Sequence, residues 1–254
     1  MKLFISAAWS LVMRDYRVRF RRTLLGIVWF LVPLFALVGM ALLVGKDAGL
    51  YAGEESGFYF VQLLSGLVLW QLLADTWLEP MRFARRANMI LRAVTFDQRT
   101  LLLAGALSAL VAFALKLPVL IAALLWFQPP LNFSIGLLPL GICALIATGM
   151  TLACFTLPVS LALLDVRYAL PFVQYALLLA TPIFYTAPEK GLVHWVNQYN
   201  PFTYLVPPVR DMLTGQPFSV VPVLLSSVII AVLLGVGLTY FQAKVRLAIA
   251  YIGH

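Results

Sequence analysis

Residues Arg14–Pro33 read RDYRVRFRRTLLGIVWFLVP, with five arginines within nine residues and a strongly apolar run directly after them. An apolar run of about 20 residues is long enough to cross the hydrocarbon core of a bilayer as a helix. Positively charged flanks of such helices stay on the cytoplasmic side. The stretch therefore predicts a first membrane span that follows a cytoplasmic N-terminus.

The whole chain has the composition of a multi-span membrane protein. Of its 254 residues, 63% are hydrophobic and 11% are charged, whereas soluble domains contain about 25% charged residues. A soluble fold with this composition would leave large apolar patches in water. The net charge of +8 does not indicate nucleic-acid binding, because a basic patch needs a soluble face and these charges flank apolar runs.

Six apolar segments predict an all-α integral membrane fold with six transmembrane helices in a single domain, residues 1–254. They are residues 23–44, 58–78, 101–127, 135–164, 168–186 and 219–241. The fourth contains Pro158, which predicts a bend or a break. Of the 18 Lys and Arg residues, 14 fall on the side of the N-terminus and three on the other side. The positive-inside rule therefore predicts that both ends of the chain are cytoplasmic.

Residues 1–22 predict an amphipathic helix that lies in the membrane interface. Polar side chains recur at helical spacing, at Lys2, Ser6, Ser10, Arg14, Arg17 and Arg21. Such a helix places its arginines at the lipid headgroups. A plain positively charged flank is the alternative. A cleaved signal peptide is excluded, because the apolar run begins only at Thr23 and exceeds the apolar core of a signal, about 7–15 residues.

The cytoplasmic segment of residues 79–100 combines several arginines with a few apolar side chains. Pro80 stands where a helix could begin, and Arg82, Arg85 and Arg86 follow it. The segment is either a short amphipathic helix that docks a cytoplasmic partner or a loop bound to solvent and headgroups.

The apolar part of the outer segment, residues 187–218, is too short to span a membrane. Asn200-Pro201 is a helix-start signal, with a cap residue followed by proline at the first helical position. We expect one or two short re-entrant helices that dip into the outer leaflet, where protein or a wet cavity must cover their backbone.

Recognisable catalytic motifs are missing from the sequence. No G-x-x-x-x-G-K-[ST] phosphate-binding loop occurs, and two histidines without a Cys/His cluster make a metal site unexpected. Asp75 and Glu79 stand one turn apart at the inner end of the second span. We expect them to pair with Arg82 and Arg86 rather than to perform acid–base chemistry.

Two features within the spans leave alternatives open. Lys116 lies near the middle of the third span, where an ionisable group marks either a functional site or a snorkelling side chain, and no acidic partner is expected at its depth. The scarcity of acidic residues in the spans argues against an ion-coupled carrier. Tyr168, Phe172 and Tyr175 share one helical face, which is typical of packing but also suits the apolar faces of sugars.

Three motifs occur in a characteristic order along the chain. They are the arginine-rich Arg14–Phe20 followed by Leu25-Gly26-Ile27-Val28-Trp29-Phe30-Leu31-Val32-Pro33, then Thr181-Pro182-Ile183-Phe184-Tyr185, and then Asn200-Pro201 with Arg210 and Gly215. In motif order, length and number of spans, the chain resembles the membrane subunit of type-2 ABC exporters of polysaccharide. This is the family of O-antigen, capsule and teichoic-acid export permeases.

The resemblance implies a transport subunit rather than an enzyme, in the bacterial cytoplasmic (inner) membrane. Two copies of the chain would bind two copies of a separate cytoplasmic ATPase, which would hold ATP and Mg, and this chain would hold no cofactor or metal. The other partners would be a lipid-linked glycan and membrane lipids, and not nucleic acid.

The resemblance also implies roles for four groups of residues. Contact with the ATPase would involve Glu79, Arg82, Arg85, Arg86, Asp165 and Arg167. The pyrophosphate of the lipid carrier would meet Arg14, Arg17, Arg21 and Arg22. The channel would be lined by Trp29, Phe30, Tyr59, Trp70, Tyr168, Phe172 and Tyr175, and the outer gate would contain Asn200, Pro201 and Arg210.

One detail departs from the family pattern, and two other functions stay open. The family often has an arginine–aspartate pair between the fourth and fifth spans, whereas this chain reads Leu164-Asp165-Val166-Arg167. An exporter of drugs or small lipids from the same superfamily would share the six-span plan. A secondary carrier or a membrane scaffold would need no ATPase.

Overall fold

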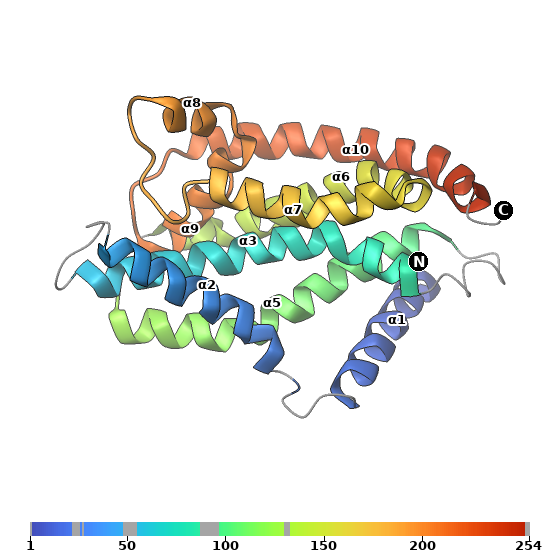
Figure 1. Cartoon of the computed structure of the whole chain (residues 1–254), viewed down its shortest axis with the longest axis horizontal. Helices are drawn as coiled ribbons and strands as arrows, with labels where there is room; N and C mark the ends of the chain where they lie inside the picture. Colours follow the sequence, from blue (N-terminus) through green and yellow to red (C-terminus); the bar gives the residue numbers. More distant parts are fainter. Residues whose placement is uncertain are drawn as a thin grey trace.

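The computed structural model describes residues 2–21, 26, 28–47, 55–86, 97–129 and 133–251. Within these ranges the chain is helical and contains no strands, which confirms the predicted all-α class. The elements are α1 (Lys2–Arg21), α2 (Val28–Asp47), α3 (Glu55–Arg86), α5 (Arg99–Phe127), η1 (Phe133–Leu137), α6 (Leu138–Ala162), α7 (Leu164–Ala180), α8 (Leu192–Tyr199), η2 (Pro201–Tyr204), α9 (Val206–Thr214) and α10 (Val220–Tyr251). Figure 1 shows the long helices lying side by side along one axis.

Five of the helical segments are long and apolar enough to cross a membrane, as in a multi-pass membrane protein. They are Val28–Lys46, Gly57–Arg86, Arg99–Phe127, Ile135–Ala162 and Val220–Val245. The fourth passes through Pro158 without a break, although a bend or a break was one expectation.

The predicted fifth span, residues 168–186, is not one of the five candidate spans. Helix α7 has 17 residues and ends at Ala180, because Thr181 is extended and the residue before a proline disfavours the helical conformation. A helix of this length covers about 25 Å, which is less than the hydrocarbon core of about 30 Å. The count of six spans therefore stays a prediction.

Helix α3 forms the centre of the bundle. It packs against α5, α6, α9 and α2, and Leu63, Leu64, Leu67 and Trp70 are almost fully buried. The apolar helices α2 and α10 lie at the periphery. In the most apolar 18-residue stretch of each, only 17% and 11% of the residues are buried inside the chain. Their exposed apolar faces suit contact with lipid or with another chain.

Two glycines allow neighbouring helices to approach α3 closely. A Cβ atom at Gly105 of α5 would lie 2.4 Å from the ring of Pro80, and one at Gly149 of α6 would lie 2.6 Å from the carbonyl oxygen of Leu73. Small residues permit such close packing of membrane helices. The expectation that a helix begins at Pro80 is wrong, because α3 accommodates Pro80 against Gly105 and continues to Arg86.

Helix α1 confirms the helix predicted for residues 1–22. One face buries Ala8, Val12 and Tyr16 against the bundle, mainly against α5, and the Tyr16 hydroxyl donates to the carbonyl oxygen of Ser108 at 3.1 Å. The described side chains of the predicted polar stripe, from Ser6 to Arg21, are exposed. Helix α1 is oblique to the long helices (Figure 1), and its position at a membrane interface stays a prediction.

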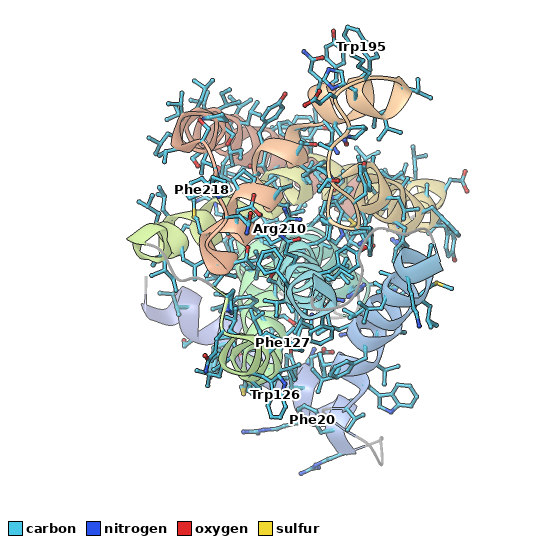
Figure 2. All side chains as sticks on the ribbon, turned by 90° about the vertical axis from the view of Figure 1, so that its left-hand side faces the viewer. Phe20, Trp126, Phe127, Trp195, Arg210 and Phe218 are labelled. Atoms are coloured by element: carbon cyan, nitrogen blue, oxygen red, sulfur yellow. The ribbon has the colours of Figure 1, made fainter. Side chains whose placement is uncertain are left out.

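The outer segment contains the expected short helices, α8, η2 and α9. Helix α9 buries Val206, Val209 and Met212 against α3, α6 and η1, so protein covers much of its surface. Helix α8 projects from the bundle and carries the exposed Trp195 (Figure 2). The chain therefore provides cover for α9, as a re-entrant helix requires.

Candidate functional site

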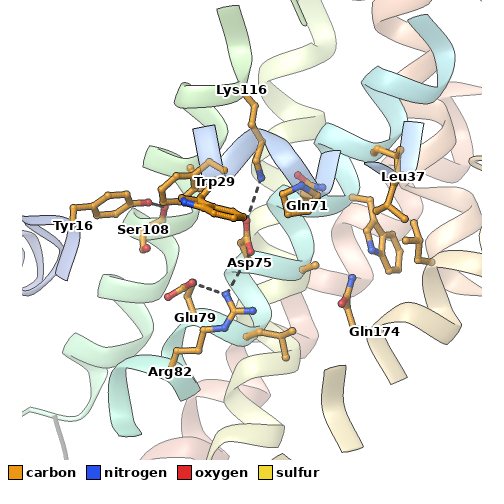
Figure 3. Close-up of a pocket in the computed structure, with 18 of the residues that line it drawn as sticks. Tyr16, Trp29, Leu37, Gln71, Asp75, Glu79, Arg82, Ser108, Lys116 and Gln174 are labelled. Carbon is orange, nitrogen blue, oxygen red and sulfur yellow. Dashed lines mark hydrogen bonds and ion pairs between the residues drawn. The ribbon is translucent and has the colours of Figure 1, made fainter. Parts of the chain in front are cut away.

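A cavity of about 530 Å³, which we call the central cavity, lies between α1 and α2 on one side and α3, α5 and α7 on the other. Aliphatic side chains such as Leu37, Leu67 and Leu178 form part of its lining, together with three other kinds of side chain (Figure 3). The aromatic ones are Tyr16, Phe20, Trp29, Phe30, Trp70 and Tyr175, the charged ones are Asp75, Glu79, Arg82 and Lys116, and the amides are Gln71 and Gln174.

The charged residues of the central cavity form a continuous chain of ion pairs. The Lys116 ammonium nitrogen lies 3.5 Å from Asp75 Oδ2, and Arg82 Nη1 lies 3.8 Å from Asp75 Oδ1 and 2.7 Å from Glu79 Oε1. Figure 3 shows the two cations on either side of the Asp75 carboxylate. The two cations and two anions carry no net charge, and their mutual attraction offsets much of the free-energy cost of burying them.

This network corrects the expectation that Lys116 has no acidic partner. Asp75 is that partner. Asp75 and Glu79 lie within the candidate span Gly57–Arg86, and Lys116 lies within Arg99–Phe127. The scarcity of acids in the spans therefore no longer argues against an ion-coupled carrier.

The pairing predicted for Arg82 is confirmed, and that predicted for Arg86 is wrong. Arg82 binds both Glu79 and Asp75. Arg86 instead forms an ion pair with Asp15 of α1. Arg86 is the exposed last residue of α3 and lies beyond the turn that carries the buried Glu79. That ion pair ties the end of α3 to α1.

The cavity wall contains buried polar groups that have no hydrogen-bond partner among the described residues. They include the indole N–H of Trp70 and the side-chain carbonyl of Gln71. Leaving a buried polar group unpaired costs about 1–3 kcal/mol. A ligand with hydroxyl or carbonyl groups would satisfy them.

Gln71 is one of the cavity residues that the sequence interpretation missed. A single amide in an apolar helix does not alter the hydrophobic period, so its direction cannot be read from spacing. The available signal was the rarity of polar side chains within spans, which tend to face the bundle interior.

The predicted channel aromatics divide between several places. Trp29, Phe30, Trp70 and Tyr175 line the central cavity. Tyr59 does not line it, and its hydroxyl donates to the carbonyl oxygen of Phe184 at 2.7 Å.

The two remaining aromatics, Tyr168 and Phe172, line a second hollow of about 360 Å³ between the end of α3 and the start of α7. We call it the α3–α7 groove. Its other lining residues are Leu78, Met81, Arg82, Arg85, Arg167, Leu170 and Pro171. Arg82 thus lines both hollows.

The predicted ATPase-coupling residues do not form one cluster. Glu79 and Arg82 line the central cavity, Arg85 and Arg167 line the α3–α7 groove, and Asp165 is exposed in the first turn of α7. Residues 87–96 of the predicted segment lie outside the described residues.

Three of the four predicted pyrophosphate-binding arginines line neither hollow. Arg14, Arg17 and Arg21 are exposed on the polar stripe of α1 and are absent from the lining of the central cavity. Arg22 lies outside the described residues.

Asn200 of the predicted outer gate fixes the start of η2, in which Pro201 is the first residue. Its side-chain oxygen accepts from the N–H of Phe202 at 3.0 Å. Its amide nitrogen donates to the carbonyl oxygen of Ala180 at 3.1 Å and to the Thr181 hydroxyl at 3.0 Å. Asn200 therefore joins the outer segment to the end of α7.

Arg210 makes a second connection of the same kind. It lies 2.9 Å from Asp211 Oδ1 and donates to the carbonyl oxygen of Pro182 at 3.3 Å. Burial raises the pKa of the Asp211 carboxyl, and the Arg210 guanidinium offsets part of that rise. These contacts make Asn200 and Arg210 structural supports of the outer segment.

The described residues contain no group of three or more His, Cys, Asp or Glu side chains placed to hold a metal ion. What the central cavity offers a ligand is therefore ring faces, amide and indole hydrogen bonds, and a neutral network of charges.

No protein-family model matches the chain, and no curated protein matches its sequence. The function is therefore argued from the residues and their geometry.

Proposed function

We propose that this chain is the transmembrane subunit of an ATP-driven exporter that moves a lipid-linked polysaccharide, of the O-antigen, capsule or teichoic-acid type, out across a bacterial cytoplasmic membrane. The observation that carries the proposal is the lining of the central cavity. Exposed ring faces stand there beside hydrogen-bonding groups that lack partners, within a bundle of candidate membrane spans. The motif order along the chain supports the same reading.

The chemistry of the lining favours a sugar over an apolar cargo. Trp29 and Tyr175 are 56% and 52% exposed, so their rings are available to the apolar faces of a sugar. Gln71, Gln174 and the Trp70 indole can bond the hydroxyl groups. An apolar drug or a small lipid would leave the buried polar groups of Trp70 and Gln71 unpaired at a cost, which favours the polysaccharide exporter over a drug exporter.

In this proposal α7 completes six crossings of the membrane. Helix α7 packs along α6 and α3, and the buried residues 181–183 extend it toward the outer side. The first residues of α1 and the last of α10 then lie at the same end of the bundle (Figure 1), as the distribution of Lys and Arg predicts. The exposed apolar face of α2 would meet a second copy of the chain.

The coupling of ATP hydrolysis to transport would pass through α3. This helix is continuous from the middle of the central cavity to Arg86, so a push from two ATPase subunits at that end would move the turn that carries Asp75 and Glu79. The ion pair between Arg86 and Asp15 would carry the same motion to α1.

A secondary carrier is the second candidate, and one observation favours it. Asp75 and Lys116 form an acid–base pair that faces the central cavity inside candidate spans. Such pairs mark proton and ion pathways in carriers. This function would need no ATPase.

The test is to purify the tagged chain in mild detergent, to identify what accompanies it, and to measure ATP hydrolysis with and without lipid-linked glycan. We expect a stoichiometric ATPase whose turnover the glycan stimulates. Trp29→Ala should reduce that stimulation. Trp126→Ala should not, because Trp126 is 83% exposed and does not line the central cavity. A chain that purifies alone under several mild conditions, and takes up a solute only with a proton gradient, would establish the carrier instead.

A further inference from the structure

The α3–α7 groove presents two arginines that are not neutralised by carboxylates. Within the described part of the chain, Arg85 forms no ion pair, and Arg167 uses its guanidinium only to donate to the carbonyl oxygen of Ser160 at 3.1 Å. The third arginine, Arg82, is held by Glu79 and Asp75. No carboxylate is among the described residues that line the groove, so the charge that these residues present is positive.

An exposed apolar stripe leads away from this groove along α7. Tyr168, Phe172, Tyr175 and Leu179 follow at helical spacing on one face and are 67%, 76%, 52% and 64% exposed. The first two also line the groove. In a chain with several candidate membrane spans, a stripe of this kind is suited to contact with a hydrocarbon chain.

We propose that the α3–α7 groove binds the phosphate group of an anionic membrane lipid. The forked guanidinium groups of Arg85 and Arg167 suit the oxygens of a phosphate, and the stripe on α7 receives the apolar chain. Basic pockets between membrane helices bind phosphorylated headgroups by the same chemistry. The volume of about 360 Å³ is enough for a headgroup, at the lower end of small-ligand sites, about 300–1,000 Å³.

A lipid fits these observations better than the other possible occupants do. A free phosphate would use the arginines but not the exposed stripe, and an acidic segment of a partner protein would have no reason to continue along α7 away from the groove. The proposal reassigns Arg85 and Arg167 from ATPase docking to lipid binding. It does not depend on the transport function, because any protein with this groove would bind the lipid.

The test is native mass spectrometry of the purified chain, released from detergent after equal additions of phosphatidylglycerol and phosphatidylcholine. We expect the wild type to retain phosphatidylglycerol preferentially. Arg85→Gln with Arg167→Gln should lower that retention about tenfold, as the loss of charge-assisted hydrogen bonds implies. The single variant Arg85→Gln should show part of the loss, and because Arg85 is exposed it should fold normally.

A matched control removes the same charge elsewhere. Lys46 and Lys244 are exposed and line neither hollow, so Lys46→Gln with Lys244→Gln should retain phosphatidylglycerol like the wild type. Phe172→Ser should weaken retention of the lipid but not binding of inorganic phosphate. These measurements contain no ATPase and no glycan, so their result is separate from the test of the exporter.

Three results would overturn the proposal. Equal retention by the groove variant and the lysine control would show that the lipid binds elsewhere. Displacement of the lipid by inorganic phosphate at equal concentration, with no effect of Phe172→Ser, would reduce the groove to a phosphate site. Normal lipid retention by the groove variant would overturn it as well, and loss of the ATPase from that variant in the separate copurification test would then make the groove a protein-docking surface.

Discussion

The ion pairs of the central cavity predict that Asp75 and Lys116 differ in their importance for stability. In Asp75→Asn, the Lys116 ammonium stays buried, with a side chain that is 5% exposed, and no other carboxylate lies within ion-pair distance in the described part of the chain. Breaking a buried pair in this way costs about 3–5 kcal/mol.

Lys116→Met should cost much less. At an effective dielectric constant of about 20, two charges at the separation of this pair attract by about 5 kcal/mol. The variant loses this attraction, but it also removes the desolvation penalty of the ammonium, which is several kcal/mol. Asp75 keeps Arg82 at 3.8 Å. The net cost should therefore be about 1–2 kcal/mol, and Asp75→Asn combined with Lys116→Met should be more stable than Asp75→Asn alone.

The assay is a titration of each variant with sodium dodecyl sulfate in mixed micelles, followed by circular dichroism, to obtain the free energy of unfolding. Lys244→Met, at an exposed position, controls for the loss of a lysine. A Lys116→Met variant as unstable as Asp75→Asn would refute the reasoning. Strictly additive effects in the double variant would do so as well, because contacting charges should show a coupling energy of about 0.5–3 kcal/mol.

Three further substitutions test other contacts of the structure. Gly149→Ala places a Cβ atom 2.6 Å from the backbone of α3 and should lower stability by about 1–3 kcal/mol, whereas Gly39→Ala, with no atom within 4 Å, should be neutral by the same titration. Asn200→Ala removes a cap and two hydrogen bonds to the end of α7; it should cost about 2 kcal/mol and increase proteolysis of residues 187–218. Burial raises the pKa of Asp211 above 3.8, so the folded protein binds that proton more tightly than the unfolded chain and the charged form destabilises it above the raised pKa. The stability of the wild type should therefore fall as the pH rises through the raised pKa of Asp211, and thermal unfolding followed over the same pH range should show no such fall in Asp211→Asn.

The sequence predicts the helices well because their cause is local. Apolar length locates the five candidate spans found among the described residues, and the period of the polar residues locates α1 with its exposed stripe. The continuation of α3 through Pro80 could not be predicted, because it depends on Gly105 in another helix. A proline reads as a helix start or stop unless the neighbour that accommodates its ring is known.

The candidate site is harder to predict, since it consists of contacts between helices. Lys116 and Asp75 are far apart in the sequence, and only the packing of α3 on α5 brings them within 3.5 Å. Arg85 and Arg86 are adjacent in the sequence, yet Arg85 lines the α3–α7 groove and Arg86 binds Asp15. Composition reveals the number of charges, and only the fold decides which of them face one another.

Arg82 connects the central cavity with the α3–α7 groove, because its side chain lines both. An anionic group in the groove would compete with Asp75 and Glu79 for its guanidinium. Lys116 would then be the only one of the two cations still paired with Asp75, and the cavity would present more negative charge to its ligand. The coupling must be reciprocal, since a cavity ligand that binds Asp75 or Glu79 would release Arg82 to the groove. Occupancy of the groove by a lipid and the charge presented to the cavity are therefore linked through one side chain.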